Sequence, residues 1–134
     1  MNRVVFTSLS DEWRTPASVY ASLNAEFAFR FDPCPMDDQS PWDGLHLPWQ
    51  FPAFVNPPYS AIAKWVEKAY REAERGTVVM LIPSRTDTRW WHEFVMKADE
   101  IRFVKGRLKF GDAKNGAPFP SCVVVFRART TPPG

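Results

Sequence analysis

The feature that most constrains the fold is a nearly continuous apolar run, TVVMLI, at Thr77–Ile82. Apolar sequence of this length without alternation is typical of a parallel strand that is covered on both faces. Such a strand needs neighbouring strands in a sheet and helices packed above and below it. The run therefore predicts an α/β layered sheet with buried strands at its centre.

Helical patterns flank this run. Thr15-Pro16 predicts a helix start, with Thr as N-cap and Pro at the first helical position, and apolar residues follow at helical spacing to about Glu26. Ser60 is the predicted cap of a second helix, which Gly76 ends. The predicted buried face of this second helix consists of Ile62, Trp65, Val66, Ala69 and Ala73.

A third helix is predicted after the apolar run, with Asp87 or Thr88 as its cap. Its core-facing side chains are expected to be Trp91, Phe94, Val95 and Ala98.

Short strands complete the predicted sheet. Phe27–Asp32 alternates, with three Phe on one face, and Ala53–Val55 is short and apolar. Ile101–Lys105 and Ser121–Arg127 also have strand patterns, and Arg107–Phe110 is a further candidate. The order of strand, helix, strand, helix and then strands favours an α/β sheet whose last strands are antiparallel.

Proline limits where regular structure can form. The chain has 13 prolines, which cluster in residues 33–58 and 118–133. Proline removes a backbone donor and fixes φ, so residues 33–52 are expected to form a loop. With 134 residues, the chain is expected to be a single domain, residues 1–134, with its core in about residues 13–127.

Several classes of protein do not fit the sequence. Met1–Ser10 has no apolar core flanked by basic residues, and no apolar run approaches the ~20 residues that cross a bilayer. A cytoplasmic protein without membrane contact is therefore expected. Cys34 and Cys122 are far apart and are predicted to be reduced thiols. Together with His46 and His92 they lack metal-ligand spacing, so no metal is expected.

Charge is distributed unevenly along the chain. Residues 1–100 carry ten Lys and Arg against fourteen Asp and Glu, whereas residues 101–134 carry seven against one. A basic end is commonly a solvated face, and it also suits a phosphate backbone. The charge therefore favours nucleic acid only weakly.

The candidate site is Asn56-Pro57-Pro58-Tyr59, which lies between a predicted strand and a predicted helix. Ligands of open α/β sheets collect at the carboxyl ends of such strands. The side-chain oxygen of Asn56 and the carbonyl of Pro57 can accept from a planar amino group and favour its tetrahedral form during attack. Tyr59 can stack on a nucleic-acid base that is flipped out of its double helix, a contact that contributes ~1–3 kcal/mol.

This chemistry suits more than one target. Adenine N6, cytosine N4 and the side-chain amide of a protein glutamine are all planar nitrogens. The structural alternative is a proline turn whose Tyr covers the core.

Motifs along nearly the whole chain, from about residue 13 to 127, resemble those of the phage-type N6-adenine DNA methyltransferases, which use S-adenosylmethionine. The matching segments, in the order of that family, are Trp13-x-Thr15-Pro16, Phe31-Asp32-Pro33-Cys34, Asp43-Gly44-Leu45, Val55-Asn56-Pro57-Pro58-Tyr59-Ser60, Trp65-Val66-x-Lys68-Ala69, Leu81-Ile82-Pro83-Ser84-Arg85-Thr86-Asp87-Thr88, Lys105-Gly106-Arg107-Leu108-Lys109-Phe110 and Pro118-Phe119-Pro120-Ser121.

The resemblance implies a reduced Rossmann-like methyltransferase sheet with helices on both faces and an antiparallel terminal strand. It implies S-adenosylmethionine as cofactor, S-adenosylhomocysteine as product, and a flipped-out adenine of double-stranded DNA as substrate. Thr15-Pro16 resembles the segment under the methionine part of the cofactor. Asp32-Pro33-Cys34 resembles the loop whose carboxylate faces the amino group of the cofactor. Asp43 is a candidate for the ribose or adenine, and Asn56 also borders the cofactor.

The sequence departs from the family pattern in the cofactor half. Cys34-Pro35-Met36 stands where a glycine-rich turn is usual. Between Asp32 and Ala53 the chain is too short for two further strand–helix units, since one βαβ unit takes ~30 residues. That half of the sheet is therefore expected to be reduced or missing. A homodimer, weak activity, and a degenerate fold that binds DNA without catalysis stay open as alternatives.

Five residues are candidates for DNA contact. They follow the central apolar run or lie in the basic end of the chain, and they are Arg85, Thr86, Arg89, Arg107 and Lys109. Arg107 and Lys109 alternate with apolar residues, so both can face phosphate. The resemblance places such a protein in the cytoplasm of a bacterial host, where a prophage can encode it.

Overall fold

The computed structural model describes residues 14–34, 43–110 and 116–129. Its centre is a four-stranded sheet in the order β1-β2-β4-β3. The strands are β1 (Ala53–Val55), β2 (Val78–Pro83), β3 (Glu100–Phe103) and β4 (Ser121–Phe126). β1 and β2 are parallel, and β4 is antiparallel to both β2 and β3. The expected α/β sheet with an antiparallel last strand is therefore present, and that strand lies inside the sheet rather than at its edge.

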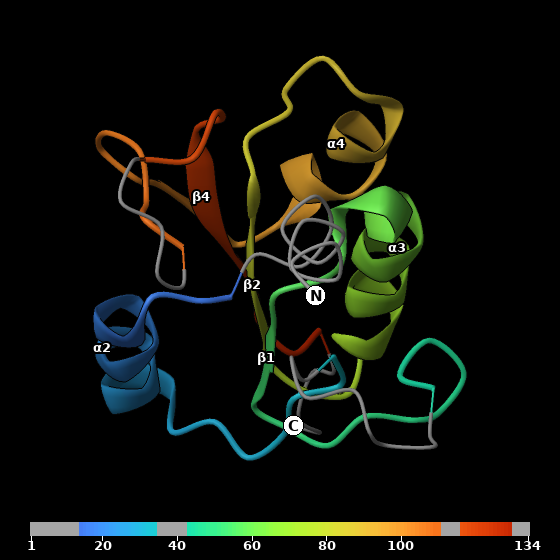
Figure 1. The fold of residues 1–134 in the computed structure, drawn as a ribbon. Coiled ribbons are helices and arrows are strands. Elements are labelled where there is room, and N and C mark those ends of the chain that lie inside the picture. Colours follow the sequence, from blue (N-terminus) through green and yellow to red (C-terminus); the bar gives the residue numbers. More distant parts are fainter. Residues whose placement is uncertain (1–13, 35–42, 111–115, 130–134) are drawn as a thin grey trace, which may run out of the picture.

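Helices cover both faces of this sheet, as predicted. α2 (Ala17–Phe27) lies on one face, and α3 (Ile62–Glu72) and the short α4 (Arg89–Glu93) lie on the other (Figure 1). One-turn 3₁₀ helices, η1 (Tyr59–Ala61) and η2 (Val95–Lys97), precede α3 and follow α4. No helix among the described residues has both the length and the apolar character needed to cross a bilayer.

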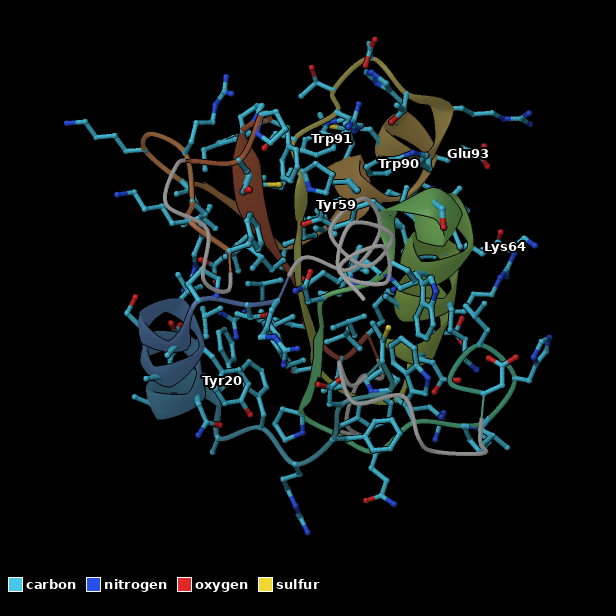
Figure 2. All side chains as sticks on the ribbon, in the orientation of Figure 1. Tyr20, Tyr59, Lys64, Trp90, Trp91 and Glu93 are labelled. Carbon is cyan, nitrogen blue, oxygen red and sulfur yellow. The ribbon has the colours of Figure 1, made fainter. Side chains whose placement is uncertain are left out.

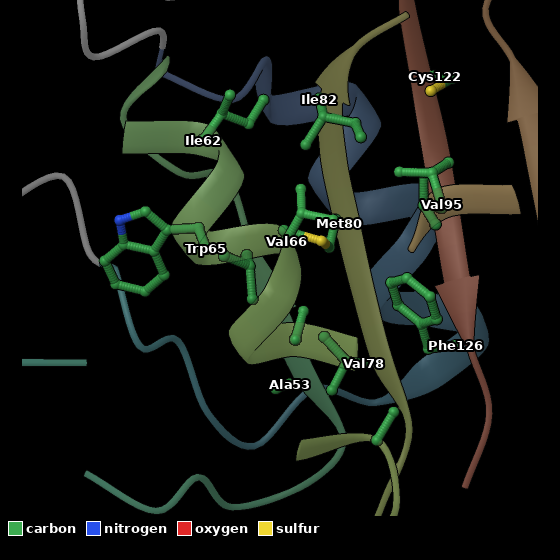
Figure 3. Close-up of a cluster of buried hydrophobic side chains, with 14 of the residues drawn as sticks. Ala53, Ile62, Trp65, Val66, Val78, Met80, Ile82, Val95, Cys122 and Phe126 are labelled. Atoms are coloured by element: carbon green, nitrogen blue, oxygen red, sulfur yellow. The ribbon is translucent and has the colours of Figure 1, made fainter. Parts of the chain in front are cut away.

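Alternate strand residues form the core under α3 and α4. Val78, Met80 and Ile82 of β2 point to this face, because successive side chains of a strand point to opposite faces (Figure 3). The predicted face of the second helix is fully confirmed, since all five of its residues are buried. Trp91 and Val95 are also buried here, so the predicted third helix contributes to the core although it is short.

Aromatic rings hold α2 on the other face of the sheet. Leu23 is its buried residue, and Tyr20 meets Phe54 of β1 edge-on at 5.2 Å between ring centroids. Phe29, after the helix, also packs on Phe54 at 5.2 Å. These contacts place the first turn of α2 beside β1.

Several element predictions are wrong. The alternating segment Phe27–Asp32 is not a strand, because α2 continues to Phe27 and Ala28 takes a left-handed conformation (φ 53°) that ends it. Only Phe31 pairs, as a single parallel bridge to Ala53. Ser60 lies inside η1 and does not cap α3, whose N-cap is Ala61.

Arg107–Phe110 does not form a strand either; in this segment the Leu108 carbonyl accepts from the Ala117 N–H at 2.8 Å. The predicted cap of the third helix is confirmed: the hydroxyl of Thr88 accepts from the Trp91 N–H at 3.3 Å.

A buried carboxylate joins the loop before β1 to α3. Glu72 is 9% exposed and accepts from the ammonium of Lys68 at 2.7 Å, from the Trp49 N–H at 3.2 Å, and from the Arg75 guanidinium. Burial alone would raise the pKa of Glu72, but these hydrogen bonds outweigh it and hold the pKa below the ordinary value. The carboxylate thus stabilises the loop in its ionised form.

We expect Glu72→Gln to lower the free energy of unfolding by about 1.5–3 kcal/mol, since it weakens hydrogen bonds between charged groups. Because the folded pKa is lowered, the deficit is full above the ordinary pKa of 4.5 and closes as pH falls through the folded value. Urea unfolding between pH 7 and pH 3 measures both effects. Glu67→Gln is the matched control, because Glu67 pairs with Arg71 on the exposed side of α3. Equal losses in the two variants at neutral pH would contradict this account.

Candidate active site

The parallel strands bring three predicted segments together where β1 and β2 end. This end of the sheet, at the carboxyl ends of the two strands, is the edge meant below. Phe31 forms a parallel bridge to Ala53, so the Asp32 loop follows a residue that lies next to β1. On the other side, Val55 pairs with Met80, and β2 continues to Pro83. The Asp32 loop, the Asn56 tetrapeptide and the loop that begins at Ser84 therefore all start at the carboxyl ends of parallel segments, which is where ligands of such sheets bind.

Asn56 is a buried polar residue of this edge, with 5% of its surface exposed. Val55 faces α3, so alternation places the next side chain on the α2 face. There the Nδ2 group of Asn56 donates to the Thr15 hydroxyl at 2.9 Å. The structure thus joins two candidate residues that are 41 positions apart in the chain. The prediction that Thr15 caps α2 is wrong. The N-cap of this helix is Pro16, and no side chain caps it. The Thr15 hydroxyl accepts from Asn56 instead.

Tyr59 is half-buried and packs against both cores. Its ring meets Phe119 edge-on at 5.4 Å, and Figure 2 shows it at the end of the sheet where Trp90 and Trp91 also lie. Burial raises the pKa of the Tyr59 phenol far above its ordinary value, and nearby Arg85 partly opposes this effect. The phenol is therefore neutral at physiological pH, and its contribution is an aromatic surface and not a base.

Phe119 is a site residue to which the sequence assigned no role. It is buried, touches Tyr59 and also packs on Phe110. Its neighbour Pro120 accepts from the Ser84 N–H at 2.9 Å, which ties this segment to the loop after β2. The segment Pro118-Phe119-Pro120-Ser121 is among the motifs that resemble the family, but the sequence alone does not predict which side chain Phe119 contacts.

Asp32 presents a carboxylate at the same edge. It lies at the surface, and its Oδ1 accepts from the Cys34 N–H at 2.9 Å. The surrounding protein desolvates the carboxyl and raises its pKa, while the Cys34 N–H lowers it. A neighbouring cation would remove this penalty, so the position favours a positively charged ligand. Cys34 and Cys122 are both free thiols, and Cys122 is buried in the core.

Asp43 lies in a turn that is packed against the Asp32 loop. Its carboxylate accepts from the Leu45 N–H at 2.9 Å and pairs with Nδ1 of His46 at 2.7 Å. These two contacts lower its pKa, the Leu45 N–H most. Gly44 packs directly on Pro33, since a Cβ added there would lie 2.2 Å from the Pro33 carbonyl oxygen. Asp43 thus caps its own turn near Asp32.

The candidate DNA residues border this edge on two sides. Arg85 and Thr86 are exposed on the loop after β2, and Arg89 is exposed at the start of α4, paired with Glu93 at 2.7 Å. Arg107 and Lys109 are exposed on the other side.

The segment that carries Arg107 and Lys109 alternates in burial as predicted, with Leu108 half-buried and Phe110 buried. It is linked to the edge through Ala117, whose carbonyl accepts from Arg107 at 3.4 Å.

Two surface hollows lie along α3 rather than over Asn56. One is lined by Leu45, His46, Lys64, Glu67, Lys68 and Arg71, and the other lies between α3 and α4. Within the described ranges, no group of three or more His, Cys, Asp and Glu side chains is placed to hold a metal ion.

The family described as DNA N-6-adenine-methyltransferase (Dam) matches residues 4–132. This match covers nearly the whole chain. The chain belongs to the Dam family. The resemblance drawn from the motifs is thereby confirmed, and DNA is the substrate that the family name implies. No curated protein and no solved structure matches this Dam-family chain.

Proposed function

We propose that this chain transfers a methyl group from S-adenosylmethionine to N6 of a flipped-out adenine in double-stranded DNA. Asn56 carries the proposal: it is a buried carboxamide in a proline-stiffened turn at the carboxyl end of β1, in a chain of the Dam family. In the proposed reaction the methyl carbon leaves the sulfonium sulfur, a bond forms to N6, and N6 loses one proton. The products are S-adenosylhomocysteine and N6-methyladenine.

The tetrapeptide can supply the two acceptors that the reaction requires. The amino group of adenine is a poor nucleophile because its lone pair is delocalised into the ring. Hydrogen bonds from its N–H groups to the Asn56 oxygen and the Pro57 carbonyl would favour the tetrahedral nitrogen. Pro57 is buried and proline has no N–H, so no donor of this residue competes there. Tyr59, neutral and aromatic, offers a face for stacking.

The edge beside Asn56 fits the methionine end of the cofactor. The Asp32 residue is accessible from solvent there, while the protein around its carboxyl group desolvates it and raises its pKa. An ammonium group beside this carboxylate would be favourable. Thr15-Pro16 and Pro33-Cys34 would flank the same end, and Asp43 lies near it through the contact of Gly44 with Pro33. When bound, the cofactor supplies the electrophilic methyl group.

Exposed cations support DNA as the substrate. Arg85 and Arg89 on one side of the edge, and Arg107 and Lys109 on the other, can hold phosphates while the target base enters between them. Thr86 adds a hydroxyl on the same loop. These exposed cations support a path of the DNA backbone across this edge.

The proposed function is tested with purified protein, methyl-labelled S-adenosylmethionine and unmethylated double-stranded DNA, followed by digestion to nucleosides. We expect the label in N6-methyladenine, and none when the DNA is already methylated at N6. Label in cytosine or in protein would overturn the choice of adenine. Salt-sensitive DNA binding without any transfer would instead show a non-catalytic DNA-binding protein.

A further inference from the structure

We infer that Thr15 is a positioning residue that sets the orientation of the Asn56 carboxamide. This inference deepens the proposed function and rests on it for its meaning in catalysis. The observation that carries it is the bond from Nδ2 of Asn56 to Oγ1 of Thr15, at 2.9 Å. It goes beyond the cofactor contact that the family resemblance implies for Thr15.

The Asn56–Thr15 bond has a defined direction in this structure. A carboxamide has a donor end and an acceptor end, and its two orientations differ by a half-turn about one bond. Here Nδ2 donates to the Thr15 hydroxyl, so the oxygen lies on the opposite arm of the planar group. That oxygen is the atom that would accept from the amino group of the base. Rotation of the amide would present N–H groups to the substrate and repel it.

The position of the Thr15 hydroxyl is itself fixed from several directions. Thr15 precedes proline, which restricts its backbone to extended conformations, and its branched side chain has few rotamers. The next residue, Pro16, accepts from the Tyr20 N–H at 3.0 Å in the first turn of α2. Tyr20 in turn packs edge-on against Phe54, two residues before Asn56. The docking of α2 on β1 therefore holds the hydroxyl in register with the carboxamide.

Two substitutions separate this role from a structural one. Thr15→Val keeps the shape of the side chain and removes the hydroxyl, whereas Thr15→Ser keeps the hydroxyl. Thr77→Val is the control for the exchange itself, because Thr77 lies before β2, at the other end of the parallel strands.

For Thr15→Val we expect kcat to fall by about 10- to 100-fold, as for a slightly misplaced reacting group. The KM for S-adenosylmethionine and the affinity for S-adenosylhomocysteine should change much less than kcat, and Thr15→Ser should restore most of kcat. A raised KM for the cofactor with unchanged kcat would overturn the inference, since Thr15 would then act only on the cofactor. Equal losses in the Val and Ser variants would also overturn it.

A second measurement does not depend on methyl transfer. The side-chain amide protons of Asn56 are observable by ¹H–¹⁵N NMR and are assigned by their absence in Asn56→Ala. In Thr15→Val we expect the bonded amide proton to shift upfield and to exchange faster with water, while Thr77→Val leaves it unchanged. An unchanged amide signal in Thr15→Val would show that the hydroxyl does not orient the carboxamide. If the wild-type protein transfers no methyl group, the proposed function fails and this test still decides the orientation.

Discussion

Asn56→Ala is expected to reduce methyl transfer to adenine by about a thousand-fold or more, since removal of one preorganised hydrogen-bonding group from a transition state costs ~10²–10³ in kcat. The loss is expected to be at the upper end because Asn56 is the buried carboxamide of the tetrapeptide. The Pro57 carbonyl alone would leave one N–H of the base without its acceptor. Single-turnover assays with saturating cofactor and DNA measure the effect on the chemical step.

Asn24→Ala is the matched control for this substitution. The Asn24 side chain accepts from the Phe29 N–H at 2.9 Å, after the end of α2 and on the surface. Its removal also deletes one Asn and one hydrogen bond, but far from the edge of the sheet. We expect transfer by Asn24→Ala to stay near the wild-type rate. Comparable transfer by Asn56→Ala and the wild type would remove Asn56 from the proposed reaction.

Gly44→Ala is expected to lower the free energy of unfolding by about 3 kcal/mol, the upper part of the range for overpacking a well-filled site. An added Cβ would lie 2.2 Å from the Pro33 carbonyl oxygen and 2.9 Å from Cη2 of Trp65. The first of these neighbours is backbone and cannot rotate away. Because Pro33 follows Asp32, the substitution should also displace the Asp32 loop and, under the proposed function, weaken binding of S-adenosylhomocysteine. Urea unfolding and calorimetry measure the two effects.

Gly106→Ala separates the clash from the general cost of replacing glycine. Gly106 has a positive φ of 76° and nothing within 4 Å of its added Cβ. Its replacement should therefore cost only the strain of the left-handed conformation, about 1–2 kcal/mol. If Gly44→Ala were no less stable than Gly106→Ala, the close packing of the Asp43 turn on Pro33 would be refuted.

The parts of the fold that the sequence predicts are those in which one physical effect dominates. The run at residues 77–82 indicated a buried central strand because its side chains from Val78 to Ile82 are all apolar, and all of β2 is buried. The face of α3 was predictable from spacing alone. By contrast, the alternation of Phe27, Phe29 and Phe31 predicted a strand. Instead α2 extends through Phe27, and the Phe29 ring packs on Phe27 and Phe54.

The candidate site was predictable where its residues are neighbours in the chain. Asn56-Pro57-Pro58-Tyr59 is a local motif, and its place after β1 follows from the short apolar strand before it. The partners of these residues come from distant segments: Thr15 for Asn56, and Phe119 for Tyr59. No spacing rule connects them, because only the docking of α2 and the pairing of β4 bring them together. Glu72 was missed for the same reason, since its partner Trp49 belongs to a loop.

The place of β4 between β2 and β3 has a consequence for the order in which the protein assembles. β4 is the last strand in the chain and contacts both neighbours along its buried length. Until β4 has left the ribosome, β3 lacks its partner strand in this sheet and β2 is paired on one side only. Pairing of strands that are distant in sequence is slow, because the loop entropy is lost before the contacts form. Formation of this sheet during synthesis is thus expected to wait for residues 121–126. When they pair, Ser121 takes its place opposite Pro83, at the same end of the sheet as Asn56.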